Sequence, residues 1–340
     1  MGWPRVCVRD GSRLKPATDI FAMGHALAAL AVSQCARAMA LVLFLQAGAC
    51  AATPEVWDDR GRTLRLTTPA ARIVSIAPHL TEIAFAAGVG ARLIAVSAYS
   101  DYPPEAKRLP RVGDGARVDI ERILVLKPDL ALAWKSGNQA GDIEKLERLG
   151  IPVWVSEASR LSDLSRLLRD VAVLAGDAAA GERAAADFER ELRRLRERHG
   201  VAAGEQRPLR VFYEIWHRPL LTINGTHMIS DAIAVCGGHN VFAGVPVLTP
   251  SVSLESVLAA RPQIVLGGGS ANGEAEFRSR WQQIPLPALR AIPARYIAPD
   301  SIQRQSPRVL DGIRAICTHL DVARAHQNRA RKFGVRLEGP

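Results

Sequence analysis

The residues with the clearest chemical potential are two glutamates at matched places in a repeated segment. Residues 118–134 read VDIERILVLKPDLALAW and residues 252–268 read VSLESVLAARPQIVLGG, so Glu121 and Glu255 lie 134 positions apart. Each copy predicts a short helix that ends before a proline, followed by a strand. A lone carboxylate in a first helical turn would indicate only a favourable helix start. A matched pair predicts two acidic points that dock onto arginines of a two-fold partner.

Motifs for catalysis or metal binding are weak. Gly267-Gly268-Gly269-Ser270 follows a strand-like run but lacks the GK[ST] of a phosphate loop and the second glycine of GxSxG, so it predicts a turn. The eight histidines include no HxH or HExxH pair. His79, before a predicted helix, is the histidine best placed to face a cleft, although a polar loop residue is the simpler interpretation. We therefore predict no catalytic residue and no metal site.

The elements that must position the glutamates alternate between strand and helix. From Arg72 a β-branched strand, an amphipathic helix and a second strand follow one another, and the rhythm returns after Leu209. This predicts an α/β fold of two Rossmann-like lobes with mostly parallel sheets, joined by one long rigid helix. The predicted segments are an N-terminal lobe at 52–176, a linking helix at 177–200, a C-terminal lobe at 201–325 with a closing helix at 307–320, and a basic flexible tail at 326–340. Two lobes joined in this way predict a cleft with limited closure.

The first 51 residues have the pattern of a targeting segment. Residues 38–45 (AMALVLFL) form an apolar run of signal-peptide length, with Arg37 before it and small residues around Cys50 after it. We expect 1–51 to hold a signal peptide behind an over-extended start, and the mature protein to begin near Ala52 in the periplasm. Lipid anchoring of Cys50 is the alternative.

Composition excludes a nucleic-acid surface. The net charge is +10, but acids alternate with arginines in segments such as 189–198, and only 5% of residues are aromatic. With 48% hydrophobic residues, the 340-residue chain can form two globular lobes with cores of their own.

Two cysteines remain once the leader is set aside. Cys236 and Cys317 would then share an oxidising compartment, where thiols pair. We expect a disulfide within the C-terminal lobe, with two buried free thiols as the alternative.

Four stretches of the chain resemble one family of transport proteins. SAYSDYPPEA (97–106), IERILVLKPDLALAWKSGN (120–138), VCGGHNVF (235–242) and Asp300 with RQSP (304–307) resemble the cobalamin-binding type of the helical-backbone, or class III, substrate-binding proteins of ABC importers. The resemblance spans residues 72 to about 322. It implies a monomeric, non-catalytic binder that captures cobalamin or a related corrinoid and delivers it to a permease dimer in the inner membrane.

The resemblance also implies roles for single residues. Glu121 and Glu255 match the glutamates that engage arginines of the permease, and Cys236 and Cys317 match a disulfide. Tyr99 and Trp134 match aromatic residues of the cobalamin type, and a loop that contacts the ligand's periphery corresponds to Asp300, Ser301, Ile302, Gln303 and Arg304.

The chain departs from the family's pattern at two aromatic positions. Residues 113–117 (GDGAR) and Thr249 stand where the best-known member carries tryptophans. Trp216 would restore aromatic surface to the cleft, or else pack at the end of its strand. These departures keep haem or a ferric siderophore as the alternative ligand; the first would need a tyrosine or histidine as axial ligand, the second several arginines.

Overall fold

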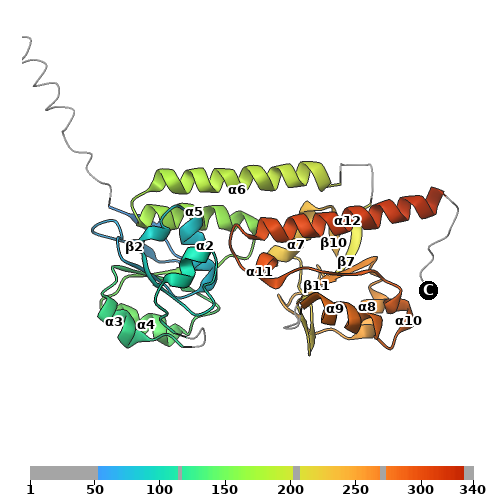
Figure 1. Cartoon of the computed structure of the whole chain (residues 1–340), viewed down its shortest axis with the longest axis horizontal. Helices are drawn as coiled ribbons and strands as arrows, with labels where there is room; N and C mark the ends of the chain where they lie inside the picture. The colour runs from blue at the N-terminus through green and yellow to red at the C-terminus, as the bar shows by residue number, and fades with distance from the viewer. Residues whose placement is uncertain (1–52, 114–116, 202–206, 269–272, 333–340) are drawn as a thin grey trace, which may run out of the picture. The chain divides into compact units, whose positions relative to one another are not determined.

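The computed structural model describes residues 53–113, 117–201, 207–268 and 273–332. The expected signal peptide at 1–51, with Cys50, lies outside these residues, and so do positions 333–340 of the expected tail. The described residues belong to one compact unit, which contains two four-stranded sheets (Figure 1).

The first sheet is parallel, and its strands lie in the order β4-β3-β5-β6. Its strands are β3 (Ile73–Ser75), β4 (Leu93–Val96), β5 (Leu130–Trp134) and β6 (Val153–Ser156). Its helices are α2 (Pro78–Ala86), α3 (Ile120–Leu126), α4 (Ala140–Arg148) and α5 (Leu161–Leu174), with 3-10 turns at Gly90–Arg92 and Pro104–Arg108. An antiparallel hairpin of β1 (Glu55–Trp57) and β2 (Thr63–Arg65) precedes the sheet.

The second sheet is also parallel, in the order β10-β7-β11-β12. Its strands are β7 (Leu209–Glu214), β10 (Gly238–Asn240), β11 (Ile264–Gly267) and β12 (Ala294–Tyr296). Its helices are α7 (Met228–Val235), α8 (Leu254–Ala259), α9 (Gly273–Gln282), α10 (Pro287–Arg290), α11 (Pro299–Ile302) and α12 (Val309–Lys332), and β8 (Trp216–His217) pairs with β9 (Leu220–Leu221).

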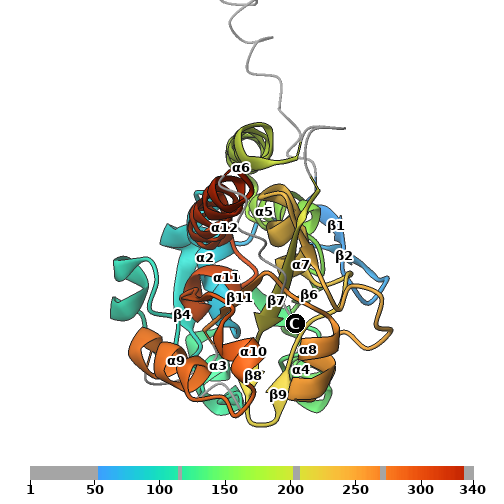
Figure 2. The ribbon, with the colours of Figure 1, turned by 90° about the vertical axis from the view of Figure 1, so that its right-hand side faces the viewer.

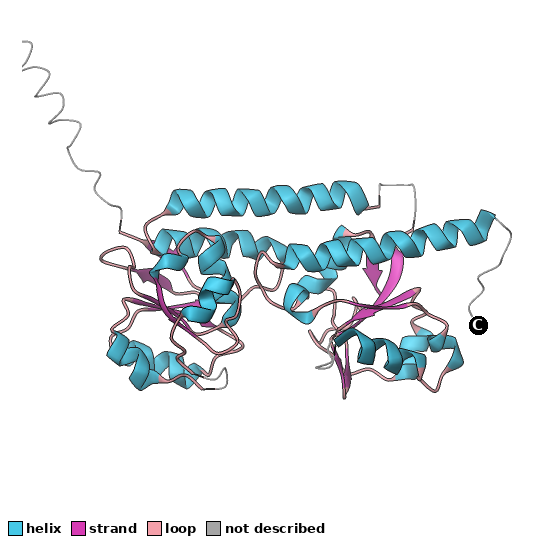
Figure 3. Cartoon of the chain, in the orientation of Figure 1, coloured by secondary structure: helices cyan, strands magenta, loops and turns pink. Residues whose placement is uncertain are grey.

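The two sheets repeat one topology. In each, the first strand along the chain is internal, the second lies on one side of it, and the third and fourth follow on the other side. Helices cover both faces of each sheet (Figure 3), so the inner strands β3, β5, β7 and β11 are almost entirely buried. The predicted α/β fold with two mostly parallel sheets is confirmed.

One long helix connects the two sheets in sequence. The helix α6 (Ala178–His199) follows α5 and leads toward β7, and it packs against α5, α7 and α12. Gly181 permits the close approach of α5 and α6, because a Cβ there would lie 2.5 Å from the Cβ of Ala172. In Figure 2, α5, α6 and α12 gather on one side of the unit, and α3, α4, α8 and α10 lie on the other.

The hydrophobic core has three parts. The largest contains residues of both sheets and the apolar faces of α5, α6, α7 and α12. A smaller part fixes α3 and α4 through residues such as Ile123 and Leu146, and a third fixes α8 and α9 through Val257 and Phe277. The short helices α3 and α8 therefore each have an apolar anchor on their own sheet.

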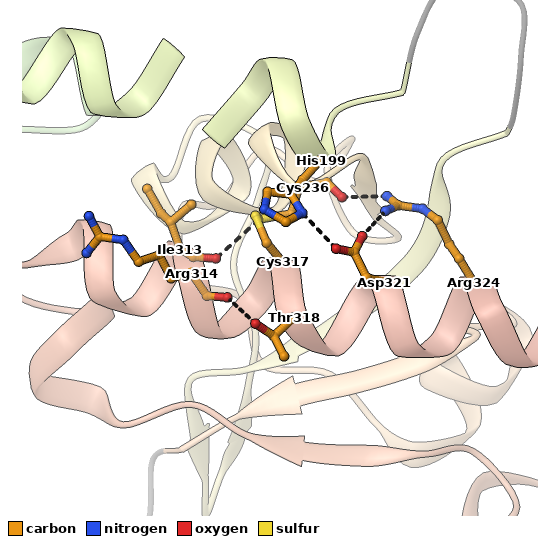
Figure 4. The surroundings of a disulfide bond; sticks show 8 residues. All are labelled: His199, Cys236, Ile313, Arg314, Cys317, Thr318, Asp321 and Arg324. Carbon is orange, nitrogen blue, oxygen red and sulfur yellow. Dashed lines mark hydrogen bonds and ion pairs between the residues drawn. A yellow bond between two sulfur atoms is a disulfide. The ribbon is translucent and has the colours of Figure 1, made fainter. Parts of the chain in front are cut away.

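The predicted disulfide is present (Figure 4). Cys236, at the end of α7, and Cys317, in α12, are joined with an S–S distance of 2.06 Å across a sequence separation of 81. Beside it, Asp321 accepts from His199 Nδ1 at 2.7 Å and from Arg324 at 2.8 Å. These contacts tie the end of α6 to α12, and the disulfide ties α7 to the same helix.

The closing helix differs from its expected range. It begins at Val309 and continues to Lys332, well past the expected end at Leu320 and into the expected tail. The physical reason is local, because residues 313–332 contain neither glycine nor proline and are rich in alanine and arginine. Within the described ranges, no helix is both long enough and apolar enough to cross a membrane.

Candidate functional site

A buried carboxylate receives three donors from residues 304–308, the first of which is a predicted ligand residue. Glu82, in α2, is 3% exposed, and Arg304 Nη1 donates to its Oε1 at 3.0 Å. Ser306 Oγ donates to its Oε2 at 2.5 Å, and Arg308 Nη1 lies 3.4 Å from its Oε1. Because Glu82 belongs to the first sheet's lobe and residues 304–308 belong to the second, these contacts fasten the two lobes together.

Arg304 also holds two carboxylates at the surface. Its Nη1 donates to Asp101 Oδ1 at 2.9 Å, and its Nη2 lies 3.1 Å from Asp300 Oδ1. Burial alone would raise the pKa of Asp101, but the hydrogen bond and charge of Arg304 outweigh burial and hold that pKa below its ordinary value. The planar guanidinium therefore orders one acidic residue from each lobe around itself.

A histidine and a tryptophan lie beside this network. The His79 and Trp134 rings meet edge to face, with centroids 5.1 Å apart, and Trp134 Nε1 donates to Glu157 at 3.2 Å. The simpler interpretation of His79 as a polar loop residue is wrong, because His79 is buried in the first turn of α2. Its Nε2 has no partner among the described atoms. Burial, and then the charge of Arg304, lower the pKa of His79 to about 3, so its imidazole is neutral.

Two predicted aromatic residues are exposed. The Tyr99 side chain is 72% exposed, and its backbone adopts φ +62°, a left-handed conformation that costs energy in a residue other than glycine. Trp216 is 47% exposed, and its Nε1 donates to the carbonyl of Arg218 at 2.9 Å. The aromatic surface available to a ligand at these positions is thus larger on Tyr99 than on Trp216.

The structure brings some of the predicted ligand residues together and not others. Asp300 and Arg304 meet directly, and Tyr99 lies two positions before Asp101, the second acidic partner of Arg304. Trp134 contacts His79, which lies three positions before Glu82 in α2. Trp216 lies instead beside His217, with ring centroids 5.6 Å apart. Ser301 Oγ donates to the carbonyl of Ala298, Gln303 is half-buried, and Ile302 is fully buried in the core. The Ile302 side chain therefore anchors its loop from inside.

Sequence reasoning did not identify the partners that hold this loop. These are Glu82, Asp101, Ser306 and Arg308. One signal was present, because Glu82 is the single acidic residue in the mostly apolar helix PHLTEIAFA, and a buried charge needs partners.

The two glutamates of the repeat lie in matched settings. Glu121 in α3 and Glu255 in α8 are both exposed in the first turn of their helices. The Asp119 side chain accepts from Arg122 N at 3.0 Å, and Ser253 Oγ accepts from Ser256 N at 3.1 Å, so both helices begin with a side-chain cap. A backbone hydrogen bond and then one to Ser253 lower the pKa of Glu255.

A cavity of about 540 Å³ lies elsewhere, where α5, α6 and α7 meet. None of the predicted ligand residues borders it; its lining includes Arg160, Phe188, Arg193, Arg196 and Asp231. Across the described ranges, no group of three or more histidine, cysteine or acidic side chains could hold a metal ion. The residues around Arg304 are thus the candidate functional site.

Comparison with known proteins finds relatives of this chain among periplasmic binding proteins. The family model described as periplasmic binding protein matches residues 73–294. The vitamin B12-binding protein of Vibrio cholerae is 37% identical over 255 residues, covering 75% of this chain and 91% of the relative. That of Pectobacterium carotovorum is 41% identical over 249 residues, covering 73% and 88%.

Solved structures of periplasmic binding proteins have the same fold as this chain. The crystal structure of the periplasmic vitamin B12-binding protein of Vibrio cholerae superposes with a TM-score of 0.64 at 38% identity, covering 75% of this chain and 98% of that one. The periplasmic haem-binding protein of Roseiflexus sp. RS-1 gives 0.63 at 26% identity, with coverage of 75% and 99%. The shared fold therefore accommodates more than one kind of ligand.

Proposed function

The chain belongs to the periplasmic binding protein family, and on that premise we propose that it captures vitamin B12 or a related corrinoid and delivers it to an ABC importer. The observation that carries the proposal is the meeting of Asp300 and Arg304 from one lobe with Asp101 from the other, two positions from Tyr99. The likeness to vitamin B12-binding proteins, at 37% and 41% identity, selects the corrinoid among the ligands of this fold.

The residues at this site suit a flat macrocycle with amide side chains. The exposed ring of Tyr99 offers an apolar face, and Trp134 backs the same region through His79. Asp300 is exposed and can accept hydrogen bonds from amide N–H groups at the rim of a corrinoid. Because Arg304 is held by Glu82 and Asp101, its role in our proposal is to fix Asp300 in place.

Titration calorimetry of residues 52–340 with cyanocobalamin tests the proposal. We expect saturable one-to-one binding, and Tyr99→Ala should weaken it roughly tenfold, as the loss of a large aromatic contact does. Trp57→Ala is the control, because Trp57 is also exposed but lies in the β1–β2 hairpin. No heat with cyanocobalamin would refute the corrinoid; binding of haemin instead would favour the haem alternative.

Delivery to the importer is the second half of the proposal. We propose that Glu121 and Glu255 pair with arginines of a permease dimer, since their helices α3 and α8 lie on the same side of the unit, away from α6 (Figures 1 and 2). We also propose that residues 1–51 direct export and are removed, and that the mature chain acts as a monomer.

The double variant Glu121→Ala/Glu255→Ala tests docking onto the importer separately from ligand binding. Cyanocobalamin affinity should be unchanged, whereas affinity for an importer complex in nanodiscs should fall by a factor of about 100, the loss of two charge-assisted pairs. Loss of cyanocobalamin binding in this variant would contradict a role of the two glutamates in docking alone.

A further inference from the structure

An arginine caps the C-terminal end of α3. Arg72, just before β3, donates from Nε to the carbonyl of Lys127 at 3.2 Å and from Nη2 to the carbonyl of Leu126 at 2.6 Å. These two carbonyls end the helix that carries Glu121. The guanidinium therefore joins the start of an inner strand to the far end of a surface helix.

The second lobe repeats this contact. Arg210, in β7, donates from Nε to the carbonyl of Arg261 at 3.1 Å and from Nη2 to the carbonyl of Ala260 at 2.5 Å. Those carbonyls follow directly on α8, the helix that carries Glu255. The acceptor residues of the two lobes are 134 positions apart, the same separation as the two glutamates.

The backbone of each arginine is held in the same way. The Arg72 N–H donates to Asp129 Oδ1 at 2.9 Å, and the Arg210 N–H donates to Gln263 Oε1 at 2.9 Å. Asp129 and Gln263 are again 134 positions apart. The acceptor is a charged carboxylate in one lobe and a neutral amide in the other. The two lobes therefore share the position of the acceptor oxygen but not its charge.

Helices this short need such support. α3 has seven residues and α8 has six, whereas an isolated helix is marginal below about 12–15 residues. The last carbonyls of a helix have no partner within it, and a cation there also favours the helix dipole. Lys127 and Arg261 adopt φ +47° and +43°, so the chain turns out of the helix at the point where each guanidinium binds.

We propose that Arg72 and Arg210 are positioning residues for the docking glutamates. Each one locks the end of its helix to an inner strand, while the side-chain cap at the other end fixes the first turn, where the glutamate lies. Both glutamates are thereby held at a fixed separation and angle before they meet a partner, which lowers the entropy cost of docking. This proposal rests on the docking role proposed above for Glu121 and Glu255.

The test compares four forms of the mature protein: wild type, Glu121→Ala/Glu255→Ala, Arg72→Gln/Arg210→Gln, and Arg148→Gln/Arg278→Gln. The last is a matched control, because Arg148 and Arg278 are exposed and each pairs with a glutamate one turn away, within α4 and α9 respectively. Each form is measured for cyanocobalamin affinity, for affinity toward an importer complex in nanodiscs that binds the wild type, and for hydrogen exchange of α3 and α8.

The arginine variant should bind cyanocobalamin like the wild type, exchange faster in the last turns of α3 and α8, and bind the importer roughly tenfold more weakly, the combined size of two helix-end contacts. Lysine at both positions should restore part of this loss, since it keeps the charge but contributes one donor group in place of the fork.

The outcomes separate the two proposals. If the glutamate variant binds the importer normally, the docking role itself is wrong. If the glutamate variant loses importer affinity while the arginine variant keeps it, docking stands and the positioning role is overturned. Loss of cyanocobalamin binding in the arginine variant, or an equal loss of importer affinity in the matched control, would also overturn it.

Discussion

At the scale of single residues, His79 shows how a neutral imidazole is kept inside a charged network. The ring contacts Trp134, and the positive charge of Arg304 opposes its protonation. Burial contributes more to the low pKa of His79 than that charge does. Proton uptake at His79 therefore favours the unfolded chain.

This gives a pH dependence with a definite sign. The pKa of His79 is about 3 in the folded protein, against an ordinary value of 6.5, so the unfolded chain binds more protons between these limits. Stability should fall as the pH drops below about 6.5, by about 1.4 kcal/mol per pH unit from this group. His79→Phe, which keeps the ring contact, should flatten the dependence in urea unfolding between about pH 7 and pH 4.5.

Two other buried groups also affect how stability depends on pH. His227, whose burial lowers its pKa to about 4, acts in the same direction, and Asp170, whose burial raises its pKa to about 6, acts in the opposite one. The informative quantity is therefore the difference in pH slope of the free energy of unfolding between wild type and His79→Phe. Equal pH slopes for wild type and His79→Phe would refute the assignment to His79.

At the scale of elements, the disulfide joins α7 to α12 across 81 residues. Restricting a loop of this length in the unfolded chain stabilises the fold by about 4 kcal/mol in the chain-entropy view. Replacing Cys236 and Cys317 by serine should lower the free energy of unfolding by roughly that amount, measured in denaturant. A reductant should destabilise the wild type and leave the variant unaffected; an unchanged unfolding midpoint in the variant would contradict the prediction.

Much of the fold could be predicted because its elements repeat. The periodicity of residues 118–134 and 252–268 predicted both helix–strand units, and both appear with side-chain caps at Asp119 and Ser253. The end of α12 could not be predicted by looking for a stop signal, since residues 313–332 contain no glycine or proline. The expectation of a binding protein rather than an enzyme is confirmed by membership in the periplasmic binding protein family, which also places the protein in the periplasm.

The candidate site was less predictable than the fold. The loop of residues 300–304 was identified through resemblance alone, and nothing in its own sequence points to Glu82, more than 200 positions earlier. A contact between residues so far apart in the sequence depends on how the two lobes pack, and local sequence patterns do not predict that packing. The role of each predicted ligand residue stays a prediction until binding is measured.

At the scale of the whole molecule, the Glu82 network is the polar link between the lobes at the candidate site. Glu82→Gln keeps the shape but removes the charge that Arg304 and Arg308 face in a mostly buried setting. We expect the free energy of unfolding to fall by about 3 kcal/mol, as when one partner of a buried ion pair is lost. Hydrogen exchange of residues 300–308 should increase in the same variant.

Glu55→Gln is the matched control for that variant. Glu55 pairs with Arg65 at 2.8 Å on the surface of the hairpin, and both side chains are largely exposed. Its loss should cost less than about 1 kcal/mol. A similar small effect for Glu82→Gln would show that the buried pair does not fasten the lobes.

The same buried glutamate limits how this protein can be recombined with its relatives. The matched sheet order of the two lobes suggests interchangeable modules, and a chimera would take one lobe from each parent. Three donors within five positions of the second lobe depend on one carboxylate of the first. If the first lobe came from a parent without a glutamate at position 82, Ser306 and Arg308 would lose their carboxylate partner and Arg304 would keep only Asp101 and Asp300. The two lobes of a working chimera must therefore match at this one side chain.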